Sequence, residues 1–309
     1  MKKWLSVLVI AILLILAGIY IFIPSQVSIS RYIKFRSTAG GSSRFLSQKE
    51  KWNAWWPGTM NADSSYVYNG YTFTPTTPLP NTIEIDISNN TDTLPTALNV
   101  LQLSRDSVAM TWQTRMNTSS NLIQRFQRYK ESQRINTTMK EILDSLRSFM
   151  EKNENVYNIS VTQVMVTDTL LVTTKNISDH YPTTAEVYQL IGQLQNYISA
   201  QGAIASNHPM LYVHSTEDNR IQTMVAIPVN KPLPDAGSIV FKRMVPGKIL
   251  LTEVQGGLQT VRQAFTQMEY YVEDYKKISP AIPFEMLVTD RMKETDTTKW
   301  ITRIYYPVL

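Results

Sequence analysis

The sequence predicts an α+β protein in which an N-terminal transmembrane helix is followed by two folded domains. Three observations lead to this prediction. Residues 4–23 form an uncharged apolar stretch, residues 27–151 contain alternating segments before a long helical one, and the order strand, helix, strand, strand occurs twice within residues 158–309. Apolar residues with period two are typical of half-buried strands, whereas spacings of three and four are typical of helices.

The composition excludes several classes of chemistry. The 309 residues are 43% hydrophobic and 18% charged, which provides enough apolar material for two cores. The absence of cysteine excludes disulfides, thiolate catalysis, iron–sulfur clusters and cysteine-ligated zinc. The three histidines lack metal-ligand spacing, so neither a metal nor a cofactor is predicted. The net charge of +5 comes from scattered Lys and Arg, so no nucleic-acid partner is expected.

Residues 1–24 are predicted to be a single-pass membrane anchor. The apolar stretch at 4–23 reaches about 30 Å as a helix, which is the thickness of a bilayer core. A cleaved signal peptide is the alternative, but its apolar run is shorter than this one, which continues to Pro24. Lys2 and Lys3 indicate a cytoplasmic N-terminus, with both domains on the opposite side of the membrane.

Residues 27–151 are predicted to form one domain of strands closed by a long helix. Trp52, Trp55 and Trp56 lie in a region of short helices, where a packed corner is the favoured role and gating of a cavity is the alternative. The predicted elements are a strand at 27–36, short helices within 42–56, strands at 65–74, 82–88, 94–104 and 107–115, and a helix at 132–151.

Residues 158–309 contain an internal repeat, which follows a polar linker at 152–158. In both copies a proline, Pro209 or Pro283, precedes the strand that follows the helix. The first copy comprises 169–176, 183–201, 210–215 and 221–229, and the second comprises 248–254, 258–275, 284–288 and 299–308. An additional strand at 238–245 is predicted to pair with 248–254.

Glu285 is the one carboxylate inside the apolar strand at 282–288. The corresponding position of the other repeat is Leu211, so the fold itself requires only an apolar residue there. A carboxylate among hydrophobic side chains costs several kcal/mol, on the order of magnitude, unless it is paired, protonated or in contact with a ligand. An ion pair with Arg303 on the neighbouring strand is one interpretation, and a solvent-facing or ligand-facing carboxylate is the other.

The second domain resembles the GyrI-like, or AraC-type, effector-binding fold over about 158–309. The resemblance rests on the duplicated βαββ order, the helix with Tyr188 and Leu194, the turn at 256–257, and the strand containing Glu285. It implies a central groove for small lipophilic cations, with Glu285 as the cation partner. Some similar proteins hydrolyse strained rings with a glutamate and a tyrosine, and Tyr181 is among the candidates for the tyrosine.

The first domain resembles the SRPBCC, or START-like, helix-grip group over 27–151. The supporting features are the first strand, the segment from Phe45 to Gly58 with its tryptophans, and the closing helix. The resemblance implies a cavity for apolar ligands and no fixed catalytic set. Because no helix-turn-helix segment precedes the effector-binding-like domain, the DNA-binding half of a regulator is not predicted.

Aromatic and methionine side chains supply further candidate residues. Tyr188, Tyr270, Trp300 and Tyr305 are candidates for lining a groove and holding a cation by the face of a ring, with ordinary core packing as the alternative. Scattered methionines suit a pliable apolar groove, although core positions are the more common use. These are Met210, Met224, Met244, Met268 and Met286.

Three functions remain open from the sequence. The leading hypothesis is a membrane-anchored protein that binds a small cationic or amphipathic organic ligand at Glu285. The second is a hydrolase or cyclase of small electrophilic substrates, in which Glu285 acts as general acid or base and a tyrosine assists. The third is a non-catalytic scaffold that binds an unidentified protein partner.

Overall fold

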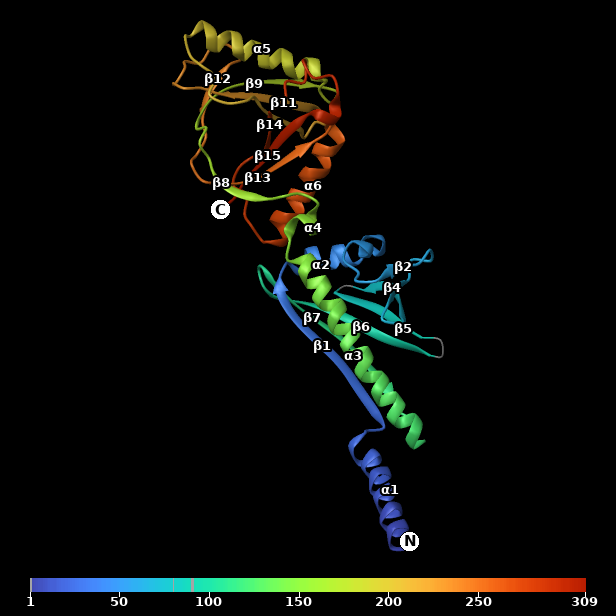
Figure 1. Cartoon of the computed structure of the whole chain (residues 1–309). Helices are drawn as coiled ribbons and strands as arrows, with labels where there is room; N and C mark the ends of the chain where they lie inside the picture. The colour runs from blue at the N-terminus through green and yellow to red at the C-terminus, as the bar shows by residue number, and fades with distance from the viewer. Residues whose placement is uncertain (1, 80, 90–91) are drawn as a thin grey trace. The chain divides into compact units, whose positions relative to one another are not determined.

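The computed structural model describes residues 2–79, 81–89 and 92–309, and it divides the chain into two compact units. Met1–Lys152 form the N-terminal unit and Asn153–Leu309 form the C-terminal unit. Both units are mixed α+β structures built on antiparallel sheets, which confirms the predicted fold class at that level (Figure 1).

The N-terminal unit begins with helix α1 (Lys2–Phe22). Within the described part of the chain, no helix is both long and apolar enough to cross a membrane. Much of the predicted anchor lies outside the residues whose side chains are described. At the end of the helix, the Arg125 guanidinium donates to the carbonyl oxygen of Ile23 at 2.8 Å, and the Tyr20 hydroxyl donates to that of Ser120.

The N-terminal sheet has seven antiparallel strands in the order β1-β7-β6-β5-β4-β3-β2. Helix α3 (Leu122–Met150) packs along β1, as Figure 1 shows. It begins well before the predicted residue 132, because the Asn121 side chain accepts hydrogen bonds from two backbone amides and caps the helix. The strands are β1 (Gln26–Arg36), β2 (Thr59–Met60), β3 (Tyr66–Tyr68), β4 (Tyr71–Leu79), β5 (Thr82–Ser88), β6 (Thr93–Ser104) and β7 (Ser107–Asn117).

Three tryptophans form a packed aromatic cluster within and just after the 3₁₀ helix η1 (Lys49–Ala54), which follows helix α2 (Ala39–Leu46). Trp52, Trp55 and Trp56 are all buried, and the ring centroid of Trp52 lies 5.8 Å from that of Tyr66. Aromatic rings at such distances contribute stability beyond their buried area. The cluster is therefore the packed corner favoured by the sequence.

The C-terminal sheet has eight antiparallel strands in the order β12-β9-β11-β10-β14-β15-β13-β8. The two predicted βαββ copies are present, as β9-α5-β10-β11 and β13-α6-β14-β15. The strands are β8 (Thr162–Met165), β9 (Leu170–Ser178), β10 (Met210–Ser215), β11 (Ile221–Pro228), β12 (Val240–Arg243), β13 (Lys248–Gln255), β14 (Phe284–Leu287) and β15 (Ile301–Pro307).

Two expectations about the C-terminal unit are wrong. The strand predicted at 238–245 does not pair with 248–254, because β12 pairs with β9, and β13 pairs instead with β15 and β8. The strand that precedes each repeat, β8 or β12, thus lies at the sheet edge beside the other repeat. The polar segment predicted as a linker contains helix α4 (Asn153–Tyr157), which buries Val156 and Tyr157.

Helices α5 (Thr184–Ala200) and α6 (Leu258–Asp274) pack on the sheet. Helix α5 covers β9 and β11, whereas α6 contacts β13 and β15 (Figure 1). The N-terminus of α5 is fixed by a capping box, in which Thr183 and Glu186 each accept a hydrogen bond from the backbone amide of the other. Each helix thus belongs to one repeat, and the central strands β10 and β14 lie between them.

The capping box predicts an acid-sensitive contribution to the stability of α5. Hydrogen bonds from Thr183 and His180 lower the pKa of Glu186 from 4.5 to about 2. A carboxylate with a lowered folded-state pKa stabilises the fold above its unfolded-state pKa, and this contribution is lost as the pH falls towards 2. Glu186→Ala is expected to lower stability at neutral pH and to flatten the stability profile between pH 4.5 and about 2.

Urea unfolding at several pH values, followed by amide hydrogen exchange in α5, measures this effect. The matched control is Glu217→Ala, which removes an exposed carboxylate from the segment between β10 and β11. Equal acid sensitivity in the wild type and Glu186→Ala would contradict the assignment.

Candidate functional site

Glu285 lies at the centre of the C-terminal sheet. On one side it pairs across the strands with Leu211 of β10, which is the position that corresponds to it in the other repeat. On the other side it pairs with Ile304 of β15. Residues paired directly across antiparallel strands project to the same face, and Leu211 packs in the core beneath α5. The Glu285 side chain therefore faces the helix-covered side of the sheet, where it is only 7% exposed.

Arg291 is the charged partner of Glu285. Its Nη2 atom lies 3.5 Å from Glu285 Oε2, and both side chains are buried. The same Nη2 atom donates to Thr302 Oγ1 at 2.8 Å, and the guanidinium lies 4.9 Å from the ring centroid of Trp300. The predicted ion pair with Arg303 is wrong, because Arg303 Nε lies 2.8 Å from the carboxylate of Glu253 on β13.

The Glu285–Arg291 pair is incompletely satisfied. Glu285 Oε2 and Arg291 Nε are both buried, and neither has a hydrogen-bond partner within the described residues. A buried polar atom without a partner costs about 1–3 kcal/mol. Burial raises the pKa of Glu285, while the charges of Arg291 and Arg262 oppose that rise. The carboxylate is thus in a site where an additional donor or positive charge would stabilise it.

A small cavity of about 50 Å³ adjoins Glu285. Residues from the beginnings of α5 and α6, the central strands and the β14–β15 segment enclose it, which places it between the two repeats. Its lining consists of Tyr181, Pro182, Thr184, Val187, Tyr188, Leu211, Leu258, Glu285, Arg291 and Trp300.

Hydrogen bonds fix the β14–β15 segment over this cavity. The Tyr188 hydroxyl accepts from the backbone amide of Arg291 at 2.6 Å and donates to the carbonyl oxygen of Thr289 at 3.3 Å. Trp300 follows the 3₁₀ helix η2 (Thr297–Lys299), and its indole N–H donates to the carbonyl oxygen of Glu294 at 2.8 Å. These contacts hold Arg291 and Trp300 above the carboxylate.

A second arginine contributes to the electrostatics of the cavity. The Arg262 guanidinium of α6 lies 4.5 Å from the ring centroid of Tyr181. Burial and the charge of Glu285 raise the pKa of Tyr181, and Arg262 opposes this rise. Tyr181 therefore remains a neutral hydroxyl at physiological pH, and the site combines aromatic faces with the Glu285 carboxyl group and the guanidinium groups of Arg291 and Arg262.

Only some of the residues predicted for the ligand site lie together in the structure. Glu285, Tyr188 and Trp300 meet at the small cavity. Tyr305 lies on the opposite face of the sheet, where its ring stacks on Phe284 with centroids 5.1 Å apart. Tyr270 lies on α6 and does not contribute to the cavity lining.

Sequence reasoning missed Arg291 and Arg262. Arg291 follows the Glu285 strand by only a few residues, but Arg262 comes from α6, and neither belongs to a recognisable motif. No group of three or more His, Asp or Glu side chains in the described residues could hold a metal ion. The observed arrangement is a buried carboxyl group beside aromatic rings, with the guanidinium groups of Arg291 and Arg262 close to it.

Comparisons with known proteins give matches only among solved structures. No family model matches the sequence, and no curated protein matches it. The C-terminal domain of EcmrR is similar at 17% identity with a TM-score of 0.43, covering 49% of this chain and 98% of that domain. SAV2435 bound to tetraphenylphosphonium is similar at 18% identity with a TM-score of 0.32, covering 49% and 93%. A hydrolase from Listeria innocua is similar at 11% identity with a TM-score of 0.37, covering 48% and 92%.

The structure of EcmrR in a complex with DNA is also similar to this chain. This match has 18% identity and a TM-score of 0.44, and it covers 62% of this chain and 72% of that one.

The ion pair predicts a strong dependence of stability on Arg291. Arg291→Ala leaves the Glu285 carboxylate buried without its charged partner, which is expected to cost about 3 kcal/mol of unfolding free energy at neutral pH. Adding Glu285→Gln is expected to recover part of this loss, because a neutral amide replaces the unpaired charge. Urea unfolding, followed by amide hydrogen exchange in β10 and β14, measures both variants.

Lowering the pH gives a second test of the Glu285–Arg291 ion pair. Because the pKa of Glu285 is raised, the cost of Arg291→Ala is expected to shrink as the pH is lowered and the carboxyl group becomes neutral. A cost that is independent of pH and is unchanged in the double variant would contradict the assigned pair.

Proposed function

We propose that the C-terminal unit binds a small organic cation against Glu285, at the position that the Arg291 guanidinium occupies in the described structure. The observation that carries the proposal is the buried carboxylate oxygen, Glu285 Oε2, which lacks a hydrogen-bond partner among the described residues and lies beside an aromatic-lined cavity. A ligand cation would take the place of the Arg291 guanidinium, which lies 3.5 Å from this oxygen without a hydrogen bond to it.

Arg291 acts in this proposal as an internal cation that the ligand displaces. It makes the two contacts expected of a bound cation, one with the Glu285 carboxylate and one with the Trp300 ring. Since the cavity holds only about 50 Å³, an organic cation requires movement of Arg291 and of the β14–β15 segment. Drug-sized ligands occupy pockets of about 300–1,000 Å³, which is larger than this cavity. A ligand of that size would therefore bind only when the β14–β15 segment opens.

The fold assignments expected from the sequence belong to the same proposal. The duplicated βαββ order and the position of Glu285 on a central strand support a GyrI-like effector-binding unit. The seven-stranded antiparallel sheet with the long helix α3 supports an SRPBCC-like N-terminal unit.

We also propose that residues 4–23 hold the protein in a membrane, with the N-terminus in the cytoplasm and both units on the other side. The exposure of large apolar side chains along α1 supports this placement, since Trp4 is 85%, Leu14 68% and Phe22 83% exposed. Apolar surface of this kind favours a non-aqueous environment. A small cation that partitions into membranes would be concentrated near such a protein.

Cation binding is tested with tetraphenylphosphonium and the full-length protein in lipid nanodiscs. Saturable binding by the wild type is expected, and Glu285→Gln is expected to weaken it at least tenfold, on the order of magnitude for loss of a buried charge contact. Isothermal titration calorimetry gives the dissociation constants, with empty nanodiscs as the blank.

The matched control is Glu253→Gln, which neutralises an exposed carboxylate on β13. It is expected to bind the cation as the wild type does. Equal affinities for the wild type and Glu285→Gln would refute the proposed role of Glu285.

Binding is also expected to depend on pH. The raised pKa of Glu285 means that the carboxyl group becomes neutral at a pH above its ordinary value of 4.5. Affinity for the cation is therefore expected to fall as the pH is lowered through that raised pKa, and Glu285→Gln is expected to remove this dependence. Calorimetric titrations across a pH series measure it, and a wild-type affinity unaffected by acid would contradict the proposal.

Membrane attachment is tested by deleting residues 1–24. The full-length protein is expected to float with lipid vesicles and to resist alkaline carbonate, whereas the shortened protein is expected in the supernatant. Release of the full-length protein by carbonate would contradict the proposed anchor.

A further inference from the structure

A second, larger cavity lies on the face of the C-terminal sheet opposite Glu285. Its volume is about 500 Å³, within the range of pockets that hold small molecules. Met210 and Phe284 contribute to it from the central strands, and they are the immediate neighbours of Leu211 and Glu285. Because successive side chains of a strand point to opposite faces, the sheet lies between this cavity and the Glu285 cavity, and Leu211 contributes to the lining of both.

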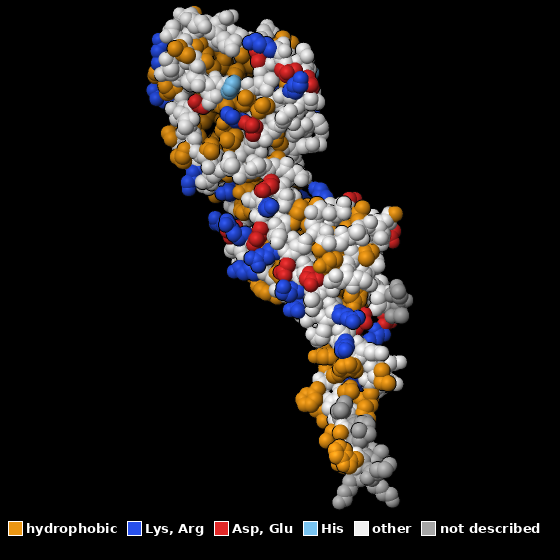
Figure 2. All heavy atoms as spheres, in the orientation of Figure 1, with side chains coloured by type: hydrophobic (Ala, Val, Ile, Leu, Met, Phe, Trp, Pro, Cys, Tyr) orange, Lys and Arg blue, Asp and Glu red, His pale blue; other side chains and the backbone are white. Residues whose placement is uncertain are grey.

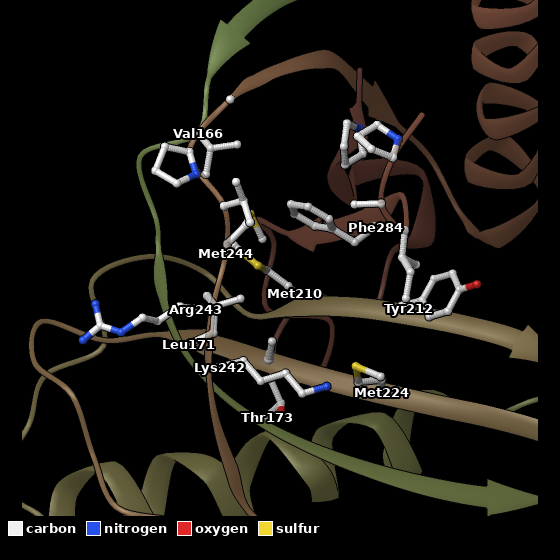
Figure 3. Close-up of a pocket in the computed structure, with 18 of the residues that line it drawn as sticks. Val166, Leu171, Thr173, Met210, Tyr212, Met224, Lys242, Arg243, Met244 and Phe284 are labelled. Carbon is white, nitrogen blue, oxygen red and sulfur yellow. The ribbon is translucent and has the colours of Figure 1, made fainter. Parts of the chain in front are cut away.

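The strand exchange between the repeats builds one wall of this cavity. The segments leading from β8 to β9 and from β12 to β13 run antiparallel beside each other, and Figure 3 shows Val166 and Met244 on them. Two backbone hydrogen bonds join the segments, from Val166 to Gly247 at 2.9 Å and from Met244 to Thr169 at 2.8 Å. The cavity is therefore a consequence of the topology and has a hydrogen-bonded frame.

The surface of the cavity is apolar and adaptable. Met210, Met224 and Met244 line it together with Leu171, Ala226 and Phe284. Unbranched methionine side chains adjust to irregular apolar ligands. Figure 2 shows hydrophobic side chains gathered around a hollow on this face of the C-terminal unit.

Large apolar side chains remain exposed among the lining residues. Val245 is 83% exposed and Ile282 is 50% exposed, although both belong to the cavity lining. An apolar patch exposed on the surface of a folded unit indicates a binding surface. These side chains extend the apolar surface of the cavity outward, as an elongated ligand requires.

The charged side chains of the lining are all positive. Lys242, Arg243 and Lys248 line the cavity, and no Asp or Glu is among its described lining residues. Lys242 pairs across the strands with Leu171, so both residues project to the cavity face. In Figure 3 the Lys242 side chain extends along the cavity, whereas that of Arg243 points away from it. Lys242 is therefore the cation best placed to meet a ligand inside the cavity.

We infer that this cavity binds a single-chain amphiphile with a carboxylate head, such as a long-chain fatty acid. The hydrocarbon chain would lie on the methionine-lined surface, and the carboxylate would contact the Lys242 ammonium. This site has the opposite charge preference to the Glu285 cavity. It does not depend on cation binding at Glu285, and each site can be disabled alone.

Fluorescence of cis-parinaric acid, a naturally fluorescent fatty acid, tests the inference with full-length protein in nanodiscs and empty nanodiscs as the blank. Saturable binding is expected, and palmitate is expected to displace the probe. Hexadecanol should compete less well, and hexadecyltrimethylammonium should compete least, because these molecules share one chain length and differ in head-group charge. Competition by the ammonium compound equal to that by palmitate would overturn the assigned charge preference.

Two variants and one control substitution test where palmitate binds. Lys242→Glu is expected to weaken palmitate binding at least threefold, on the order of magnitude for an exposed charge contact. Lys231→Glu makes the same charge change at an exposed position outside the lining and is expected to bind normally. Ala226→Trp fills the cavity and is expected to abolish saturable binding, with the circular dichroism spectrum as the check on folding.

Glu285→Gln provides the test of independence. It is expected to leave the affinity for palmitate unchanged, because Glu285 lies on the other face of the sheet. Wild-type affinity in Lys242→Glu, or loss of palmitate binding in Glu285→Gln, would overturn the inference.

Discussion

The pairing of β10 with β14 is the constraint on which the rest of the C-terminal unit depends. It joins the two repeats at the centre of the sheet and sets Leu211 directly opposite Glu285. The alternation of side chains along these strands then assigns Glu285 to the helix-covered face and Phe284 to the large cavity. A shift of one residue in this register would move the carboxylate to the other face. Two cavities with different linings thus share one pair of strands.

The Glu285–Arg291 interaction is a buried ion pair at the position where we propose that a ligand cation binds. A buried carboxylate needs a compensating charge, and Arg291 provides one at 3.5 Å while its guanidinium also lies over Trp300. However, Arg291 comes from the segment between β14 and β15, which Tyr188 holds through hydrogen bonds to the backbone. The proposed exchange of this internal cation for an external one therefore requires these hydrogen bonds to open.

Local patterns in the sequence predicted most individual elements, but not their long-range partners. The alternating strands, the two βαββ copies and the unusual position of Glu285 follow from periodicity and from comparison of the repeats. The exchange of β8 and β12 could not be predicted, because it depends on contacts between distant segments. The same reason explains the error over Arg303, whose position on the strand beside Glu285 suggested a pair that the alternation of faces forbids. Helix α3 begins early because the cap at Asn121 outweighs the weak apolar pattern of its first turns.

Replacement of Arg291 by an external cation at Glu285 is the step on which the proposed function depends. The NMR signal of the Arg291 Nε–H group, followed while the full-length protein is titrated with tetraphenylphosphonium, tests this step most directly. The signal is expected to shift as the cation saturates the wild type and not to shift in Glu285→Gln. Saturable cation binding that leaves the Arg291 signal unchanged would contradict the replacement.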